Sequence, residues 1–254
     1  MNAGLKLSKK SNLWLDVGIF SSHIGLESAI GKDCRNLTRS IMAENSPYFE
    51  SGAKLSCASP NDHWTFSGMV LNGWQRIKRV EGNSLPSFGT QIQFKPNNKV
   101  LFNSSTFVGT EKPDTARQMR YFHDFYGIYQ LSDRWELTTG FDIGWEQSRV
   151  ESSDYNTWYS AMLILRYAAN TKCALALRTE LYHDENAVII NTPTLNGFKV
   201  MGISLNFDYA VSTNAVWRIE GRLLNSQEGI FVKGNSRYIT GTNAALTTSV
   251  AVSF

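Results

Sequence analysis

Apolar and polar residues alternate along most of this 254-residue chain. The pattern is clear from Trp135 to Trp145, where Trp, Leu, Thr, Phe, Ile and Trp are separated by Glu, Thr, Gly, Asp and Gly. A period of two residues is that of a β-strand with one apolar and one polar face. The segment from Thr240 to Phe254 repeats this alternation up to the last residue. The sequence therefore predicts an all-β protein whose final residues are a full strand.

Short polar turns separate the alternating segments and divide the chain into about thirteen predicted strands. Short turns follow every second strand, and longer connections, the longest at 23–47, lie between them. This asymmetry is typical of a transmembrane antiparallel up-and-down β-barrel, whose strands need only ~9–11 residues each. A β-propeller is excluded because it would need four strands per repeat, and each repeat here holds only two. The predicted strands are 3–9, 12–22, 48–58, 63–78, 86–95, 99–109, 119–131, 135–149, 157–169, 173–184, 198–211, 215–224 and 238–254.

Charged side chains occupy the polar face of several predicted strands. Burying unpaired charges in a dry core costs several kcal/mol for each ion. A water-filled lumen removes this cost, and the solvent-exposed sheet face of a soluble β-sandwich would also remove it. On the barrel interpretation the residues expected to face the lumen are Glu136, Asp142, Arg178, Glu180, Arg218, Glu220 and Arg222.

Aromatic residues gather next to the short turns at one end of the predicted strands. Amphipathic aromatic rings at one level are typical of the interfacial girdle of a membrane barrel. Trp14 departs from this pattern because its neighbours Leu13, Leu15 and Val17 form the apolar row. The girdle candidates are Trp64, Trp135, Tyr167, Tyr209, Trp217 and Phe254.

The segments around the longest connection resemble those of the OmpL-like β-barrel porin family, which is frequent in the Bacteroidota. The resemblance lies in the stretches 22–28 (SHIGLES), 37–40 (LTRS), 43–48 (AENSPY), 70–75 (VLNGWQ) and 122–127 (FHDFYG) and extends over most of the chain. It implies an outer-membrane porin for passive diffusion of small hydrophilic solutes or ions.

A bacterial outer-membrane porin contacts the lipid bilayer and lipopolysaccharide, and the barrel-assembly machinery would read its final strand at Phe254. Bacterial single-chain barrels have even strand numbers. The odd count and the absence of a signal peptide at Met1 predict an N-terminally truncated chain, with residues 1–254 as one domain of a larger barrel. A plugged or narrow barrel acting as an anchor or surface receptor is the alternative function.

The 23–47 connection is longer than the ~12–15 residues beyond which loops are usually functional or disordered. By analogy with general porins it could fold into the lumen as a constriction, and a loop that caps the barrel rim is equally compatible with the sequence. A helical turn through 36–40 would bring Lys32, Arg35 and Arg39 together and favour anions. The constriction candidates are Glu27, Lys32, Asp33, Arg35, Arg39 and Glu44.

Composition narrows the function further. The net charge of +3 and the absence of Lys/Arg blocks argue against nucleic acid as a partner. Cys34, Cys57 and Cys173 have no metal-ligand spacing, so neither a metal nor another cofactor is expected. No GxSxG, HExxH, P-loop or GxGxxG motif occurs, and an outer-membrane enzyme is the least favoured alternative.

Overall fold

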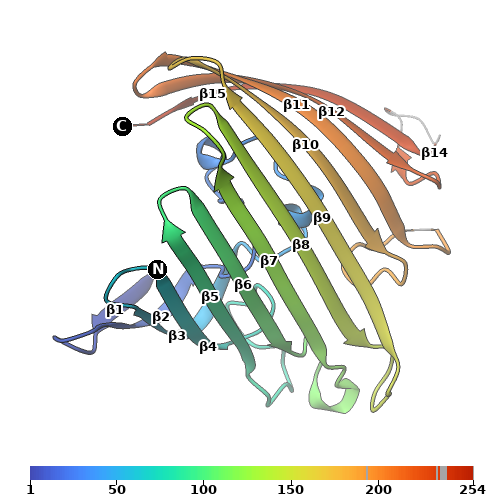
Figure 1. Ribbon diagram of the computed structural model, residues 1–254. Helices are drawn as coiled ribbons and strands as arrows, with labels where there is room; N and C mark the ends of the chain where they lie inside the picture. Colours follow the sequence, from blue (N-terminus) through green and yellow to red (C-terminus); the bar gives the residue numbers. More distant parts are fainter. Residues whose placement is uncertain (193, 233, 235–238, 254) are drawn as a thin grey trace. The chain divides into compact units, whose positions relative to one another are not determined.

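The computed structural model describes residues 1–192, 194–232, 234 and 239–253. Within these residues the chain forms a 13-stranded sheet in the order β1 to β12 and then β15, beside a two-stranded sheet of β13 and β14 (Figure 1). Neighbouring strands are antiparallel wherever the register is defined. The thirteen predicted main strands are confirmed, but the strand predicted over 63–78 ends at Leu71 and the one predicted over 3–9 ends at Lys6.

Two compact units divide the chain. Unit 1 comprises Met1–Gly25, Ser46–Gly127 and Phe141–Thr157, and unit 2 comprises Leu26–Asn45, Ile128–Gly140 and Trp158–Phe254. The bounds of the strands are β1 Asn2–Lys6, β2 Asn12–Ser21, β3 Phe49–Ala58, β4 Trp64–Leu71, β5 Ser87–Asn97, β6 Val100–Gly109, β7 Arg120–Gln130, β8 Trp135–Gln147, β9 Tyr155–Ala168, β10 Cys173–Asp184, β11 Phe198–Ser212, β12 Ala215–Ser226, β13 Phe231–Val232, β14 Ile239–Thr240 and β15 Thr242–Val252.

The helical segments are short. They are η1 (Gly31–Asp33), α1 (Ile41–Glu44) and η2 (Asp114–Ala116). No helix among the described residues has the length and apolar character needed to cross a membrane.

Cross-strand register explains why the strands of unit 2 hold together. Leu177 of β10 lies opposite Leu205 of β11, which lies opposite Gly221 of β12, and Gly221 faces Leu246 of β15. Paired residues point to one face of a sheet, so the apolar rows of neighbouring strands merge into one surface. Leu205 and Leu246 remain 56% and 77% exposed. This row therefore faces away from the rest of the unit.

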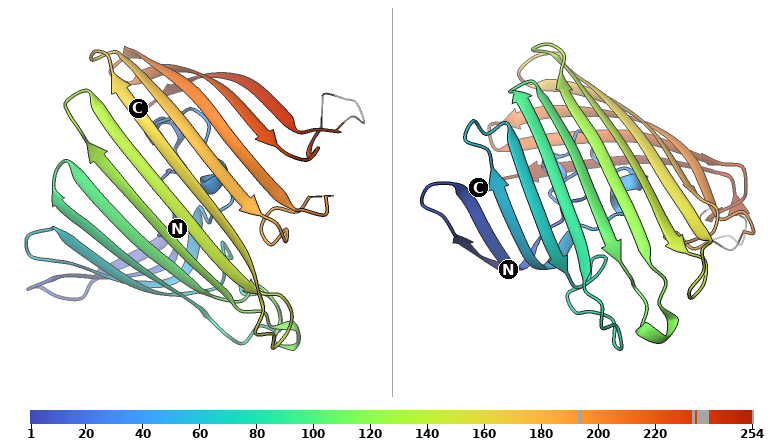
Figure 2. Two further views of the ribbon diagram at one scale, coloured as in Figure 1. Left: turned by 45° about the vertical axis from the view of Figure 1, so that its right-hand side comes forward. Right: turned by 60° about the horizontal axis from the view of Figure 1, so that its bottom comes forward.

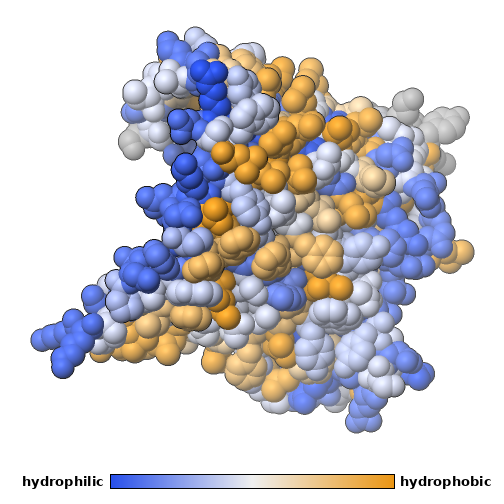
Figure 3. Space-filling view, in the orientation of Figure 1, coloured by the Kyte–Doolittle hydropathy of each residue, from blue (hydrophilic) through white to orange (hydrophobic). Residues whose placement is uncertain are grey.

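Unit 1 has the same construction. Phe66 of β4 lies opposite Ile92 of β5, and Val70 lies opposite Phe88. All four side chains are exposed. Figure 2 shows these strands beside one another, and Figure 3 shows hydrophobic side chains gathered along the strands while the turns and loop ends are mainly hydrophilic. Exposed apolar surface on this scale is expected of a sheet whose outer face contacts lipid rather than water.

The last predicted strand, 238–254, is wrong at its start. Ile239–Thr240 belongs to the hairpin of β13 and β14, and β15 begins at Thr242. The interruption is at Gly241, whose carbonyl accepts a hydrogen bond from the Ser226 backbone N–H. A local turn thus competes with the period-two pattern, which continues across it without a break.

Candidate functional site

The candidate site of unit 2 is formed by residues 26–45, here called the charged loop, and by a polar row on the sheet. The row combines alternate residues of three adjacent strands: Arg178 and Glu180 on β10, Ser204, Asn206 and Asp208 on β11, and Arg218, Glu220 and Arg222 on β12. These residues share one face because Arg178 lies opposite Ser204, which in turn lies opposite Arg222. It is the face opposite to the exposed leucines.

Backbone N–H groups of the charged loop bind this row directly. Leu37 N donates to Asn206 Oδ1 at 3.0 Å, and Thr38 N donates to Glu220 Oε2 at 2.6 Å. Ile41 N donates to Glu180 Oε2 at 2.7 Å. A loop buried without partners would leave its backbone polar groups unsatisfied. The side chains of the row therefore accept the backbone hydrogen bonds that a neighbouring strand would accept in a sheet.

Arg178 is the centre of the contact and is fully buried. Its Nη1 donates to Thr38 O at 2.6 Å, and its Nη2 donates to Thr38 Oγ1 and Glu220 Oε1 at 3.1 Å each. Glu180 and Glu27 lie 3.5 and 3.8 Å from the guanidinium. A guanidinium offers five donors in a planar fork, so it can bind the loop and the sheet at once.

Arg218 makes a second set of contacts with the loop. Its guanidinium forms an ion pair with Asp208 at 2.7 Å and donates to the carbonyls of Gly31, Cys34 and Arg35 at 2.7, 2.9 and 3.1 Å. Gly31 opens η1, and Cys34 and Arg35 follow it directly, so Arg218 binds carbonyls at both ends of this short helix. Only 1% of Arg218 is exposed.

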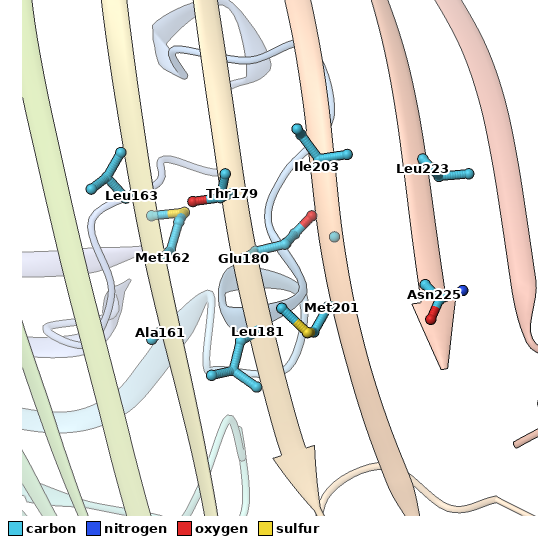
Figure 4. Close-up of a pocket in the computed structure, with 11 residues that line it drawn as sticks. Ala161, Met162, Leu163, Thr179, Glu180, Leu181, Met201, Ile203, Leu223 and Asn225 are labelled. Carbon is cyan, nitrogen blue, oxygen red and sulfur yellow. The ribbon is translucent and has the colours of Figure 1, made fainter. Parts of the chain in front are cut away.

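Apolar contacts complete the docking of the loop. Met42 of α1 packs with Met162, Ile164 and Ala176 of the sheet, and Leu26 covers the cluster. Ser40 caps the start of this helix, and its hydroxyl oxygen accepts from Ala43 N at 3.1 Å. Figure 4 shows a groove of about 520 Å³ along the same strands, lined mainly by apolar side chains such as Leu163 of β9, Leu181 of β10 and Ile203 of β11.

Each of the six constriction candidates lies within 4 Å of a group of opposite charge, so the basic ones do not form an unpaired positive cluster. Arg35 donates to both oxygens of Glu136 at 2.7 and 3.1 Å, and this hydrogen bonding raises the pKa of Arg35. Arg39 lies 3.6 Å from Glu44, and Lys32 lies 3.4 Å from Asp33.

Glu27, the sixth candidate, accepts hydrogen bonds from the backbone N–H and hydroxyl of Ser40. Burial raises the pKa of the neighbouring Cys34 thiol, which donates to Ser28 O at 3.3 Å.

The predicted helical turn through 36–40 is wrong. Residues 36–40 are irregular, and the helix is Ile41–Glu44 instead. The physical reason is competition for donors, because the N–H groups of Leu37 and Thr38 bind the sheet and cannot close a helical turn.

The residues expected to face a lumen lie on the polar face but are largely covered. Glu220 and Glu180 are 1% and 5% exposed under the charged loop, and Arg222 binds Glu180 at 2.7 Å. Asp142 belongs to unit 1 and is 3% exposed. The sequence did not identify Asn36 and Thr38 as the loop residues that bind the sheet. Ser204, Asn206 and Asp208 alternate in the same way as the charged residues, and this pattern is the signal that places them on the polar face.

The girdle candidates are partly exposed aromatic residues near strand ends. Trp64 stacks on Phe94 in unit 1, and in unit 2 Trp135 packs on Tyr167 with ring centroids 4.6 Å apart. Tyr209 lies opposite Trp217, whose Nε1 donates to Thr248 Oγ1 at 2.8 Å. Phe254 lies outside the described residues.

Comparison with known proteins identifies the architecture. Residues 1–254 match the family described as "Putative beta-barrel porin-2, OmpL-like". The chain belongs to this porin family. It is therefore an outer-membrane β-barrel porin, a channel for passive diffusion of small hydrophilic solutes or ions, and its all-β fold is that of a transmembrane up-and-down barrel. The family and fold are those of non-enzymatic channels that contact the lipid bilayer.

Solved porins share this fold at low sequence identity. An anion-selective porin from Comamonas acidovorans matches with a TM-score of 0.60 and 10% identity, over 94% of this chain and 72% of that chain. The outer-membrane channel DcaP of Acinetobacter baumannii matches with a TM-score of 0.58 and 11% identity, over 93% and 69%. OccK3 of Pseudomonas aeruginosa gives 0.53 and 11%, over 97% and 74%. None of the curated proteins matches the sequence.

Proposed function

We propose that the charged loop of this porin is the constriction that sets the size limit of its pore. The observation that carries the proposal is the docking of residues 26–45 on the polar row of β10–β12. Three backbone N–H groups and the guanidinium groups of Arg178 and Arg218 hold the loop there. A segment bound to the polar face of a barrel strand occupies part of the aqueous cross-section.

Charge pairing predicts weak ion selectivity for this constriction. Arg35 is neutralised by Glu136, Arg39 lies beside Glu44, and Lys32 lies beside Asp33. A fixed charge acts on a passing ion mainly where no opposite charge is adjacent. We therefore expect small hydrophilic solutes and ions of either sign to pass, and not the anion preference that a positive cluster would give.

Thiol modification at the loop tests the proposal. Lys32 has a 43% exposed side chain and lies in η1, where a cysteine would be reachable from water. In a background with Cys34, Cys57 and Cys173 replaced by Ala, a bulky water-soluble thiol reagent should lower the single-channel conductance of Lys32→Cys. The matched variant Lys10→Cys, in the β1–β2 turn, should keep its conductance. Equal conductance before and after labelling of Lys32→Cys would refute the constriction.

A plugged or narrow barrel is the second candidate, and the burial of Arg178 and Arg218 favours it. If the loop leaves no continuous water path, the protein would serve as a surface anchor or receptor. Electrical silence of correctly folded protein in a planar bilayer would support this function over the first.

Other features of the assembled protein follow from the family and stay proposals. We expect lipopolysaccharide to contact the outer leaflet side of the barrel, and the barrel-assembly machinery to bind the C-terminal segment that includes Phe254. We also expect residues 1–254 to act as a single domain.

A further inference from the structure

Unit 1 contains a buried hydrogen-bond network that the pore function does not use. It begins at His23, whose carbonyl accepts from Gln91 Nε2 at 3.0 Å and from Ser105 Oγ at 2.7 Å. Asn103 links these residues, since its Nδ2 donates to Ser105 Oγ and its Oδ1 accepts from Gln91, both at 2.9 Å. The same Nδ2 donates to Asp124 Oδ2 at 2.9 Å.

Asp124 and Asp142 form the far end of this network. The register that sets Arg120 of β7 against Glu146 of β8 places Asp124, four residues along β7, against Asp142, four residues back along β8. The two carboxyl groups lie within hydrogen-bonding reach of each other. They are 1% and 3% exposed. Two carboxylates opposite each other in a sheet repel if both are ionised.

One oxygen of each carboxyl group lacks a donor. Asp124 Oδ1 and Asp142 Oδ1 are both buried and accept no hydrogen bond among the described residues. Two acceptor oxygens in contact need a hydrogen between them, and a carboxylic acid facing a carboxylate supplies it. A single proton between the two carboxyl groups thus supplies a hydrogen bond that no other donor among the described residues provides.

Other charged groups around the pair do not compensate it. Arg120 is bound to Glu146 at 2.6 Å, and Tyr126, on β7, is bound to Gln93. His23 approaches from the loop side, and burial lowers its pKa to about 4, so it is neutral at pH 7. The charge of Lys54 contributes to the lowered pKa of His23, and Lys54 itself forms an ion pair with Asp16. The described residues contain no group of three His, Cys, Asp or Glu side chains suited to a metal ion.

The pair also holds the chain where the 23–47 connection begins. The backbone of Gly25 hydrogen-bonds to Asp124, and its φ of +84° is a conformation that favours glycine. We propose that Asp124 and Asp142 share one proton at neutral pH, and that this protonated pair is an alkali-sensitive anchor for the start of the charged loop. Hydroxide takes the proton to form water, leaves two opposed carboxylates, and frees Gly25.

Infrared spectroscopy of the folded full chain tests the shared proton. The carboxylic-acid band of the wild-type protein at pH 7 should lose one component in Asp124→Asn and in Asp142→Asn, and the same component on raising the pH. The exposed Asp133→Asn is the control and should keep it. A difference spectrum without such a component would overturn the proposal. So would a component that appears only after chelation, since a cation would then occupy the pair.

Single-channel recording tests the anchor. The wild-type conductance should change reversibly at alkaline pH and follow the loss of the infrared component. Asp142→Asn replaces the acid by an amide that can still donate to Asp124, so its conductance should stay constant over the same pH range. An alkaline change of equal size in Asp142→Asn, or constant conductance in the wild type while the infrared component is lost, would refute the anchoring role.

Discussion

Replacing Arg178 by Met should release the charged loop from the sheet. Methionine retains the apolar stem but removes the guanidinium that donates to Thr38 O, Thr38 Oγ1 and Glu220 Oε1. The substitution leaves Glu220 and the neighbouring Glu180 without their buried cation, although Arg222 still binds Glu180. Thr38 O loses its donor in the same step.

Breaking a buried ion pair by removing one partner costs about 3–5 kcal/mol. The protein has two ways to respond. It can retain the loop and bear the full cost, or the loop can detach so that water reaches Glu220. Local opening limits the cost to the free energy of docking the loop. Because the strands themselves do not need the loop for their register, we expect detachment, with the sheet intact.

Limited proteolysis with trypsin measures detachment. Arg178→Met should be cleaved within residues 26–45 much faster than the wild type, while a denaturant titration in lipid vesicles shows a smaller loss for the strands. Arg166→Met is the matched control. Arg166 of β9 lies opposite Ala176 of β10, so it is on the same polar face as Arg178, but it is only half-buried. It should stay within about 0.5 kcal/mol of the wild type.

A double variant separates the lost contacts from the orphaned carboxylate. Glu220→Gln combined with Arg178→Met should recover part of the loss, since the buried negative charge is gone. Equal cleavage rates and equal stability of Arg178→Met and Arg166→Met would contradict the detachment of the loop.

Three further results are expected. Leu205→Arg places a charge in the exposed apolar row and should lower the free energy of unfolding in lipid by about 2–4 kcal/mol if it lies near the bilayer midplane. Thr247→Arg, on the polar face of β15, is the control and should cost little. Refolding in lipid vesicles measures both. Asn206 cannot serve as that control, because it is fully buried and accepts a hydrogen bond from the charged loop. His23 has a pKa lowered from 6.5 to about 4, so the unfolded chain binds its proton first and stability should fall by up to about 3 kcal/mol as the pH drops from 6.5 to 4. Denaturant midpoints should show this slope in the wild type and not in His23→Gln. Phe254→Ser should strongly reduce assembly in cells, although burial of one Phe contributes only ~1.5–3 kcal/mol, too little to abolish a large barrel. Normal assembly of this variant would show that Phe254 is not part of an assembly signal.

The strands and their two faces could be predicted from the sequence because strand alternation is local. Leu205 and Asn206 differ in face by their position alone, and the register with β10 and β12 follows from matching these rows. The hairpin of β13 and β14 was missed because alternation continues across Gly241.

The contacts of the loop could not be predicted, since they join residues far apart in the sequence. Thr38 and Arg178 are 140 residues apart, and neither has a local pattern that points to the other. The assumption that Arg35 and Arg39 would lie on one helical face used only local spacing. Tertiary partners on the sheet override such spacing, because they satisfy the same N–H groups in a buried setting.

Single-channel conductance of the purified, folded protein in a planar bilayer tests the central claim most directly. A porin with a constriction docked on one part of its polar face should give discrete, stepwise currents of small amplitude with little preference for anions or cations. A bilayer that stays electrically silent, although the inserted protein is folded, would contradict the claim that this chain is an open pore.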